Sequence, residues 1–129
     1  MLQPKTYIKY LDKVLELESI RFDTKVIEVY DESCNTYRYL DFEEVEFMEN
    51  TGLKDKNGKY IYEGDIVTVN GTWDCIIEYN QSSCAFVLKS IDSRWNTGYF
   101  SNYDDIEEML EVIGNIYENK ELMEWCTNY

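Results

Sequence analysis

Histidine is absent from the sequence, and basic residues are scarce. Twelve Lys and Arg stand against 26 Asp and Glu in 129 residues, a formal net charge of −14. Without histidine the chain lacks the base of Ser-His-Asp and Cys-His catalysis and the commonest metal ligand. The shortage of Lys and Arg argues against binding to nucleic-acid phosphates and to anionic membrane surfaces. We therefore expect neither nucleic acid nor membrane as a direct partner.

Long hydrophobic runs are also missing. The longest uncharged apolar stretches, such as 75–77 and 85–88, fall far short of the ~20 residues that span a bilayer. Residues 1–7 contain neither the apolar run nor the small-residue cleavage site of a signal peptide. We therefore expect a soluble protein in the cytoplasm of a bacterial host.

Proline occurs once, and no Gly/Ser-rich linker, low-complexity tract or evident internal repeat interrupts the chain. We therefore predict a single domain over residues 1–129. With 44% hydrophobic and 16% aromatic residues, the chain is too apolar to be disordered. A domain of this length buries roughly two-thirds of its surface, so a true core is possible.

The four cysteines lack the short spacings of metal or redox sites, since no two are separated by two to four residues. We expect reduced thiols that pack as small hydrophobic side chains, and we predict no metal and no cofactor. The alternative is a disulfide between Cys75 and Cys84 across a hairpin, which requires an oxidising compartment.

The first third of the chain is predicted to be mainly β. Residues 13–22 and 25–30 alternate around a turn at Asp23-Thr24, which favours a hairpin. A helix over 6–17 competes with that interpretation, because its apolar residues also fit helical spacing. Further along, we expect a strand, one helical turn that Asp41 caps, and a second strand, at 37–40, 42–45 and 46–48.

The middle of the chain contains two Asn-Gly pairs, at Asn57-Gly58 and Asn70-Gly71. These residues tolerate the positive φ that tight hairpins require. Strands are expected around these turns and again over 84–89. We predict a mainly β fold: a small, partly open β-barrel of short antiparallel strands with one or two short helices.

The last third has a different pattern. Ile106, Met109, Leu110 and Ile113 recur at helical spacing after a polar start, which predicts an amphipathic helix over 101–112. A closing strand over 112–117 and helical turns over 119–125 are expected to follow. Residues 103–129 contain one lysine and eight acids, so their net charge is 1 − 8 = −7.

Two segments resemble the YopX-like family of phage and prophage proteins. They are residues 51–67, TGLKDKNGKYIYEGDIV, and residues 111–119, EVIGNIYEN, which place the resemblance over 46–122. At the N-terminus, Leu11 stands where this family often has tryptophan. The resemblance implies a mainly β, barrel-like intracellular domain that tends to oligomerise and has no established biochemical activity.

Each candidate site also has a structural explanation. Carboxylates of Glu63, Asp65, Asp104 and Asp105 could form an acid–base pair or bind Mg²⁺. With 26 acids, however, such proximity arises by chance, so a solvated acidic surface is favoured. In Gly64-Asp65-Ile66-Val67, glycine and aspartate are expected to shape a turn before a buried strand. We therefore assign no catalytic, cofactor-binding or metal-binding residue.

Tyrosines are unusually frequent, and two pairs lie two residues apart, Tyr37/Tyr39 and Tyr60/Tyr62. On strands each pair points to one face, which suits core packing or contact with a partner, and core packing is favoured. The only local basic cluster contains Lys54, Lys56 and Lys59, which we expect to keep a turn hydrated.

These observations favour a phage or prophage accessory protein without catalytic activity. We expect it to associate with copies of itself or with a host protein. The alternative is an acidic decoy that mimics DNA and occupies a host nucleic-acid-binding protein. A carboxylate-dependent hydrolase acting on sugar or phosphate substrates is the least favoured hypothesis.

Overall fold

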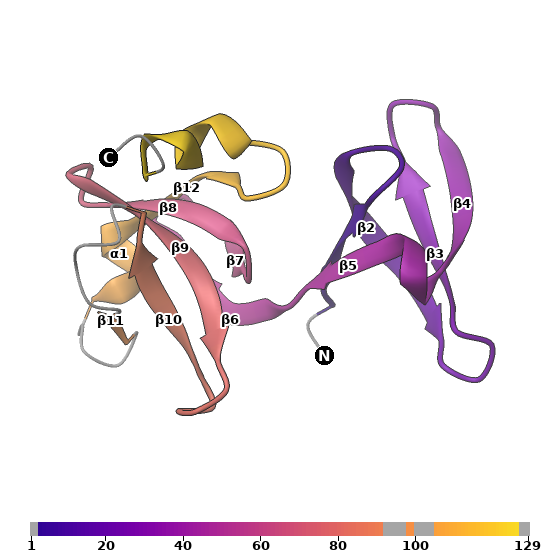
Figure 1. The fold of residues 1–129 in the computed structure, drawn as a ribbon, viewed down its shortest axis with the longest axis horizontal. Coiled ribbons are helices and arrows are strands. Elements are labelled where there is room, and N and C mark those ends of the chain that lie inside the picture. The colour runs from indigo at the N-terminus through magenta and orange to yellow at the C-terminus, as the bar shows by residue number, and fades with distance from the viewer. Residues whose placement is uncertain (1–2, 92–97, 100–104, 127–129) are drawn as a thin grey trace. The chain divides into compact units, whose positions relative to one another are not determined.

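The computed structural model describes residues 3–91, 98–99 and 105–126, and most of them lie in antiparallel strands (Figure 1). The mainly β prediction is confirmed. The chain divides into two compact units, Met1–Glu49 and Asn50–Tyr129. Each unit contains its own cluster of buried hydrophobic residues. Folding of residues 1–129 as one cooperative domain stays a prediction.

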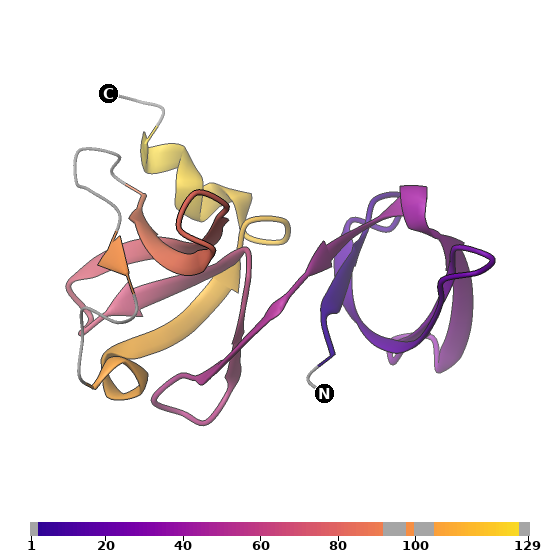
Figure 2. The ribbon, with the colours of Figure 1, turned by 90° about the horizontal axis from the view of Figure 1, so that it is seen from below.

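The first unit is a five-stranded antiparallel sheet with the order β4-β3-β2-β1-β5. Its elements are β1 (Lys5–Ile8), β2 (Lys13–Arg21), β3 (Val26–Asp31), β4 (Thr36–Asp41), the 3-10 helix η1 (Phe42–Glu44) and β5 (Val45–Met48). Figure 2 shows the sheet curling around its own interior. Among the described residues the two edge strands, β4 and β5, do not pair with each other, so the barrel is not closed.

The predicted hairpin of β2 and β3 is confirmed, and the competing helix over 6–17 is wrong. The chain reverses between β1 and β2, where Asp12 adopts a φ of 53° that ends any helix. A register shift between Leu17 and Ser19 explains the imperfect alternation along β2. The helical turn after Asp41 is also confirmed, as η1, and the Asp41 N–H donates to Glu44 Oε1 at 3.3 Å.

The core of the first unit forms on the inner face of this sheet. Ile27 and Val29 are buried on β3 while their neighbours are not, as the alternation of a strand requires. The buried members of the cluster are Ile8, Leu17, Ile27, Val29, Leu40 and Val45. Full burial of such a side chain contributes roughly 1.5–3 kcal/mol, so these residues position the sheet.

The second unit contains a five-stranded sheet with the order β11-β10-β9-β8-β12 and a separate two-stranded sheet, β6-β7. Its elements are β6 (Asn50–Lys54), β7 (Tyr60–Tyr62), β8 (Asp65–Val69), β9 (Trp73–Asn80), β10 (Ala85–Ser90), β11 (Gly98–Tyr99), α1 (Ile106–Met109), β12 (Leu110–Asn115) and the 3-10 helix η3 (Lys120–Cys126). Both Asn-Gly hairpins are confirmed. Asn70 and Gly71 have φ values of 52° and 70°.

The helix predicted over 101–112 is wrong in extent. The described helix α1 covers only Ile106–Met109, and residues 101–104 lie outside the described residues. Leu110 begins β12 because it pairs with Val69 of β8 and is buried there. The closing strand therefore starts earlier than predicted, and Ile113 is exposed on it. The helical turns expected over 119–125 are confirmed as η3.

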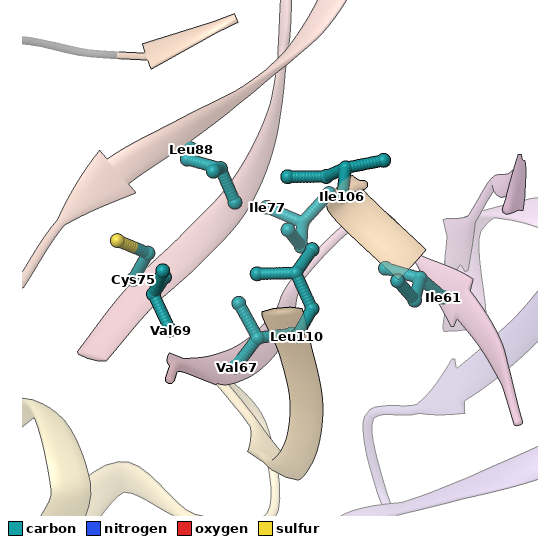
Figure 3. Close-up of a cluster of buried hydrophobic side chains, with 8 residues drawn as sticks. All are labelled: Ile61, Val67, Val69, Cys75, Ile77, Leu88, Ile106 and Leu110. Atoms are coloured by element: carbon teal, nitrogen blue, oxygen red, sulfur yellow. The ribbon is translucent and has the colours of Figure 1, made fainter. Parts of the chain in front are cut away.

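Both faces of the second sheet are buried. On one face, β8, β9, β10, α1 and β12 contribute side chains that point toward one another in Figure 3, namely Val67, Val69, Cys75, Ile77, Leu88, Ile106 and Leu110, joined by Ile61 of β7. On the other face Ile66 and Ile76 pack with Leu122 and Met123 of η3. This two-sided burial explains the β-branched run in β8.

The two five-stranded sheets share one topology. When strands are numbered within each sheet, both have the order 4-3-2-1-5. In both, a helical turn directly precedes the fifth strand: η1 in the first unit and α1 in the second. The β6-β7 hairpin has no counterpart among the described residues of the first unit. The molecule therefore repeats a strand order that was not evident as a repeat in the sequence.

The alternative disulfide between Cys75 and Cys84 is wrong, because both are free thiols. Cys75 belongs to the buried cluster on β9, whereas Cys84 lies exposed in the turn before β10. Cys34 is also free and exposed, so the expectation of buried cysteines holds for Cys75 alone of these three. The side chain of Cys126 lies outside the described part of the chain.

Across the part of the chain that the structure describes, no helix combines the length and the apolar character needed to cross a membrane.

Candidate functional site

The two segments that resemble YopX proteins lie side by side in the second unit. β8 pairs with β12, and the Ile116 N–H donates to the Gly64 carbonyl at 2.9 Å. The Lys56 N–H donates to the Leu110 carbonyl, also at 2.9 Å, which fixes the β6-β7 hairpin against β12. The segments therefore form one structural element, and its polar residues are the first candidates for a site.

Asp55 joins these segments with a buried carboxylate that is 4% exposed. Its Oδ1 accepts the N–H groups of Asn57 and Lys59, both at 2.9 Å, and its Oδ2 accepts that of Val112 at 3.0 Å. Burial acts to raise the pKa of Asp55, but the three backbone donors outweigh burial and lower it. This role was missed in the sequence, although aspartate two residues before Asn-Gly is typical of such a turn.

The structure describes three of the four residues of the proposed carboxylate site. Asp65 is buried, and its Oδ2 accepts the Tyr62 N–H at 2.8 Å, as expected for a residue that shapes a turn. Glu63 is half-buried, Asp105 is exposed before α1, and Asp104 lies outside the described residues. In the described ranges, no three Cys, Asp or Glu side chains are grouped so as to hold a metal ion.

The second motif is also explained by chain geometry. A Cβ atom on Gly114 would lie 2.5 Å from Asn119 Oδ1, which accepts the Asn115 N–H at 3.0 Å. Asn115 Oδ1 in turn accepts the N–H groups of Tyr117 and Glu118. Glycine at 114 therefore leaves room for an amide that ends β12.

Part of the acidic C-terminal charge is used inside the second unit. Glu107 Oε2 accepts the Lys54 N–H at 2.9 Å. Glu111 accepts Asn57 Nδ2 at 3.1 Å and lies 3.7 Å from Lys56 Nζ. The Lys54 ammonium lies 5.0 Å from the centre of the Tyr60 ring. Lys54 and Lys56 of the lysine cluster thus contact their own unit, and hydration of the turn stays a prediction.

The first unit holds a different buried carboxylate, Asp31, which is 1% exposed at the end of β3. It pairs with Lys13 Nζ at 2.9 Å and Arg38 Nε at 3.3 Å, and Ser33 Oγ donates to it at 2.6 Å. Hydrogen bonds from Ser33 and Lys13 hold the pKa of Asp31 well below its usual range. Asp31 follows Ile27 and Val29 at inward positions, so the alternation of the strand in the sequence could have identified it as buried.

The exposed tyrosines of β4 are the most distinctive surface of the first unit. Tyr37 is 55% exposed and Tyr39 is 69% exposed. Tyr37 lies opposite Tyr30 with ring centroids 5.0 Å apart, and Tyr39 lies opposite Glu28. A hydrogen bond with Glu28 raises the pKa of Tyr39. We call Tyr30, Tyr37 and Tyr39 the tyrosine face.

The preference for core packing of Tyr37 and Tyr39 is therefore wrong, although the alternation of exposure along β4 fits their shared face. The inner side of β4 is taken by Arg38 and Leu40, which lie opposite Val29 and Ile27. Those residues leave the tyrosines on the outer side. In the second pair, Tyr60 is 38% exposed and Tyr62 is half-buried.

A family model described as YopX protein matches residues 5–124. The chain belongs to the YopX family. The match includes both units, whereas the resemblance in the sequence began at residue 46. Membership suggests a phage-associated protein of uncertain function, and YopX is not a known enzyme family.

Among solved structures, the chain is similar to the crystal structure of protein EF1440 from Enterococcus faecalis. It is 25% identical, with a TM-score of 0.61, and the match covers 94% of this chain and 96% of that chain. The similarity therefore extends over both units. No curated protein matches the chain.

Proposed function

We propose that this chain is a cytoplasmic phage or prophage accessory protein that binds proteins without catalysing a reaction. Its partner is a second copy of itself or a host protein. The observation that carries the proposal is the tyrosine face, where two exposed aromatic side chains lie on an edge strand and contribute little to the core. Tyrosine is enriched at protein interfaces because its ring is apolar and its hydroxyl is polar.

The family match over both units supports one YopX-like domain spanning residues 1–129. The curl of the first sheet supports the partly open barrel that the sequence predicts (Figure 2). Absence of catalysis is supported by the buried carboxylates: Asp31, Asp55 and Asp65 all accept hydrogen bonds from their own chain. A hydrolase would need a carboxylate that is available to a substrate.

The acidic decoy is less well supported, because Glu107 and Glu111 of the acidic segment have partners in the β6-β7 hairpin. The two functions differ in salt dependence. Added salt screens opposite charges, so a decoy complex weakens steeply, whereas apolar self-association through the tyrosine face weakens little.

Light scattering over a micromolar concentration series, together with affinity capture from bacterial cytoplasm, tests the proposal. The variant Tyr37→Ser/Tyr39→Ser is expected to lose self-association or the captured protein. Tyr79→Ser is the matched control, since Tyr79 is 43% exposed and also packs on a neighbouring ring, that of Phe86, at 5.3 Å. The control should retain both properties.

A strict monomer that captures no protein would contradict the proposed function. If association survives in the double tyrosine variant as well as in the Tyr79 control, the tyrosine face is not the binding surface.

A further inference from the structure

The outer edge of β4 presents backbone groups that can accept another strand. The Phe42 N–H donates to the Lys25 carbonyl at 3.2 Å, just beyond the pair Asp41 and Val26. Hydrogen-bonded and non-hydrogen-bonded pairs alternate along an antiparallel ladder. The N–H groups of even-numbered β4 residues therefore point to β3, and those of residues 37, 39 and 41 point away.

One of these three outward N–H groups is already used. The Asp41 N–H donates to Glu44 Oε1 at 3.3 Å, at the start of η1. The outward groups that remain belong to Tyr37 and Tyr39, the two exposed members of the tyrosine face. Outward N–H groups and exposed rings thus occur at the same two residues.

The other sheet edges in the described ranges are shorter or covered. β12 is covered by the β6-β7 hairpin through Lys56 and Asp55, and it has a register shift between Val112 and Gly114. β5 has four residues and β11 has two. β4 has six residues in uninterrupted register with β3 and contains no proline. It therefore has neither the proline nor the β-bulge that often blocks strand addition.

Charge indicates the chemistry of the partner. Residues 26–44 contain one arginine and six acids, a net charge of 1 − 6 = −5. The whole first unit, with six basic and twelve acidic residues, has a net charge of 6 − 12 = −6. Almost all of its excess negative charge therefore lies on the β3-β4 hairpin and η1, which repels a second copy and attracts a basic segment.

We propose that β4 binds an extended basic segment of a partner protein as a sixth strand of the first sheet. Backbone hydrogen bonds form at Tyr37 and Tyr39. Lys or Arg side chains at alternate positions of the segment lie over the tyrosine rings, near Glu28 and Asp41. This inference rests on the proposed function. Of the two partners that the proposed function allows, it selects a basic protein in place of a second copy.

Two synthetic peptides test this binding. One alternates lysine with valine, and its control alternates glutamate with valine. Calorimetric titration is expected to detect binding of the lysine peptide only, weakened by salt. Hydrogen exchange measured by NMR is expected to slow at the Tyr37 and Tyr39 amides when the lysine peptide is bound.

Two variants separate the backbone contact from the ring contact. Tyr39→Ala and Tyr39→Pro both lose the ring, but only proline removes the N–H, which points away from β3. The affinity of Tyr39→Pro for the lysine peptide should fall about tenfold below that of Tyr39→Ala, as the loss of one hydrogen bond predicts. Circular dichroism checks the fold, and Tyr37→Pro against Tyr37→Ala repeats the comparison if Tyr39→Pro unfolds.

Equal affinities of the proline and alanine variants, or peptide binding that leaves both amides in fast exchange, would overturn strand addition. Protein capture through the tyrosine face would then still support the proposed function. Protection of both amides in a peptide-free homodimer would overturn the choice of a basic partner. A protein that neither self-associates, captures a protein nor binds the lysine peptide would overturn both proposals.

Discussion

The two units share a strand order but stabilise their buried carboxylates in different ways. In the first unit, Asp31 is held by the cationic side chains of Lys13 and Arg38. In the second, Asp55 is held by three backbone N–H groups. Two of these donors come from the turn itself and the third from β12, and none of them requires a long side chain to be ordered. A shared topology therefore does not determine the chemistry of its buried polar groups.

The units also differ at their edges. In the second unit the β6-β7 hairpin covers β12, whereas in the first unit β4 keeps a regular free edge with two exposed tyrosines. The same strand order thus occurs with a covered edge at β12 in one unit and an exposed edge at β4 in the other.

The largest effect on the free energy of unfolding is expected from substitutions in the two hydrophobic clusters. Ile27→Ala and Leu110→Ala each remove a fully buried side chain and should lower the free energy of unfolding by about 3 kcal/mol. Because the two residues lie in separate clusters, each substitution should accelerate amide hydrogen exchange within its own unit. Mass spectrometry of exchanged peptides measures this.

Ile113→Ala is the control, since Ile113 is 38% exposed and should change stability by less than about 0.5 kcal/mol. Exchange that accelerates evenly over both units would contradict separate unfolding. It would instead support the single cooperative domain that the sequence predicts.

A smaller effect is expected from Asp55→Ala, which removes the acceptor of three backbone N–H groups. Water can replace the carboxylate at the exposed turn but less readily at Val112, so we expect a loss of about 2 kcal/mol in urea unfolding. Asp105→Ala, at an exposed aspartate of the same unit, should be nearly neutral. Equal stability of the two variants would show that the hairpin does not depend on Asp55.

The smallest effect is expected from protonation of Asp31 in the first unit, which leaves the free energy of unfolding at neutral pH unchanged. The folded-state pKa of Asp31 is lowered, so its ion pairs stabilise the fold fully above the unfolded pKa of about 3.9. Stability should be unchanged by this group between about pH 7 and 5 and should fall as the pH drops below about 4. Asp31→Asn should flatten that dependence in exchange measurements of β3. If the pH dependence of exchange in Asp31→Asn is identical to that of the wild type, Asp31 does not cause the loss of stability in acid.

Local turns could be predicted because their conformations depend on the residues themselves. Asn70 and Gly71 tolerate positive φ wherever they occur, and the hairpin follows. The shared face of Tyr37 and Tyr39 followed from alternation in the same way. Their exposure did not, because it depends on which side of β4 meets Ile27 and Val29 across the ladder.

Long-range partners explain the remaining errors. Leu110 fits helical spacing with Ile106, but its pairing with Val69 places it in a strand. Asp55 and Val112 are 57 residues apart in the sequence, so their hydrogen bond has no local signal. The repeated topology was equally hidden, because the order of the strands repeats while the residues do not.

Because Cys75 is buried, its reaction with a thiol reagent can report when the second unit opens. Desolvation raises the pKa of this thiol to about 12, so the reactive thiolate is scarce while β9 remains in place. Cys34 and Cys84 are exposed and should react with an alkylating reagent in the native protein. With Cys34, Cys84 and Cys126 all replaced, the slow alkylation of Cys75 would time the opening of the second unit and of no other part of the fold.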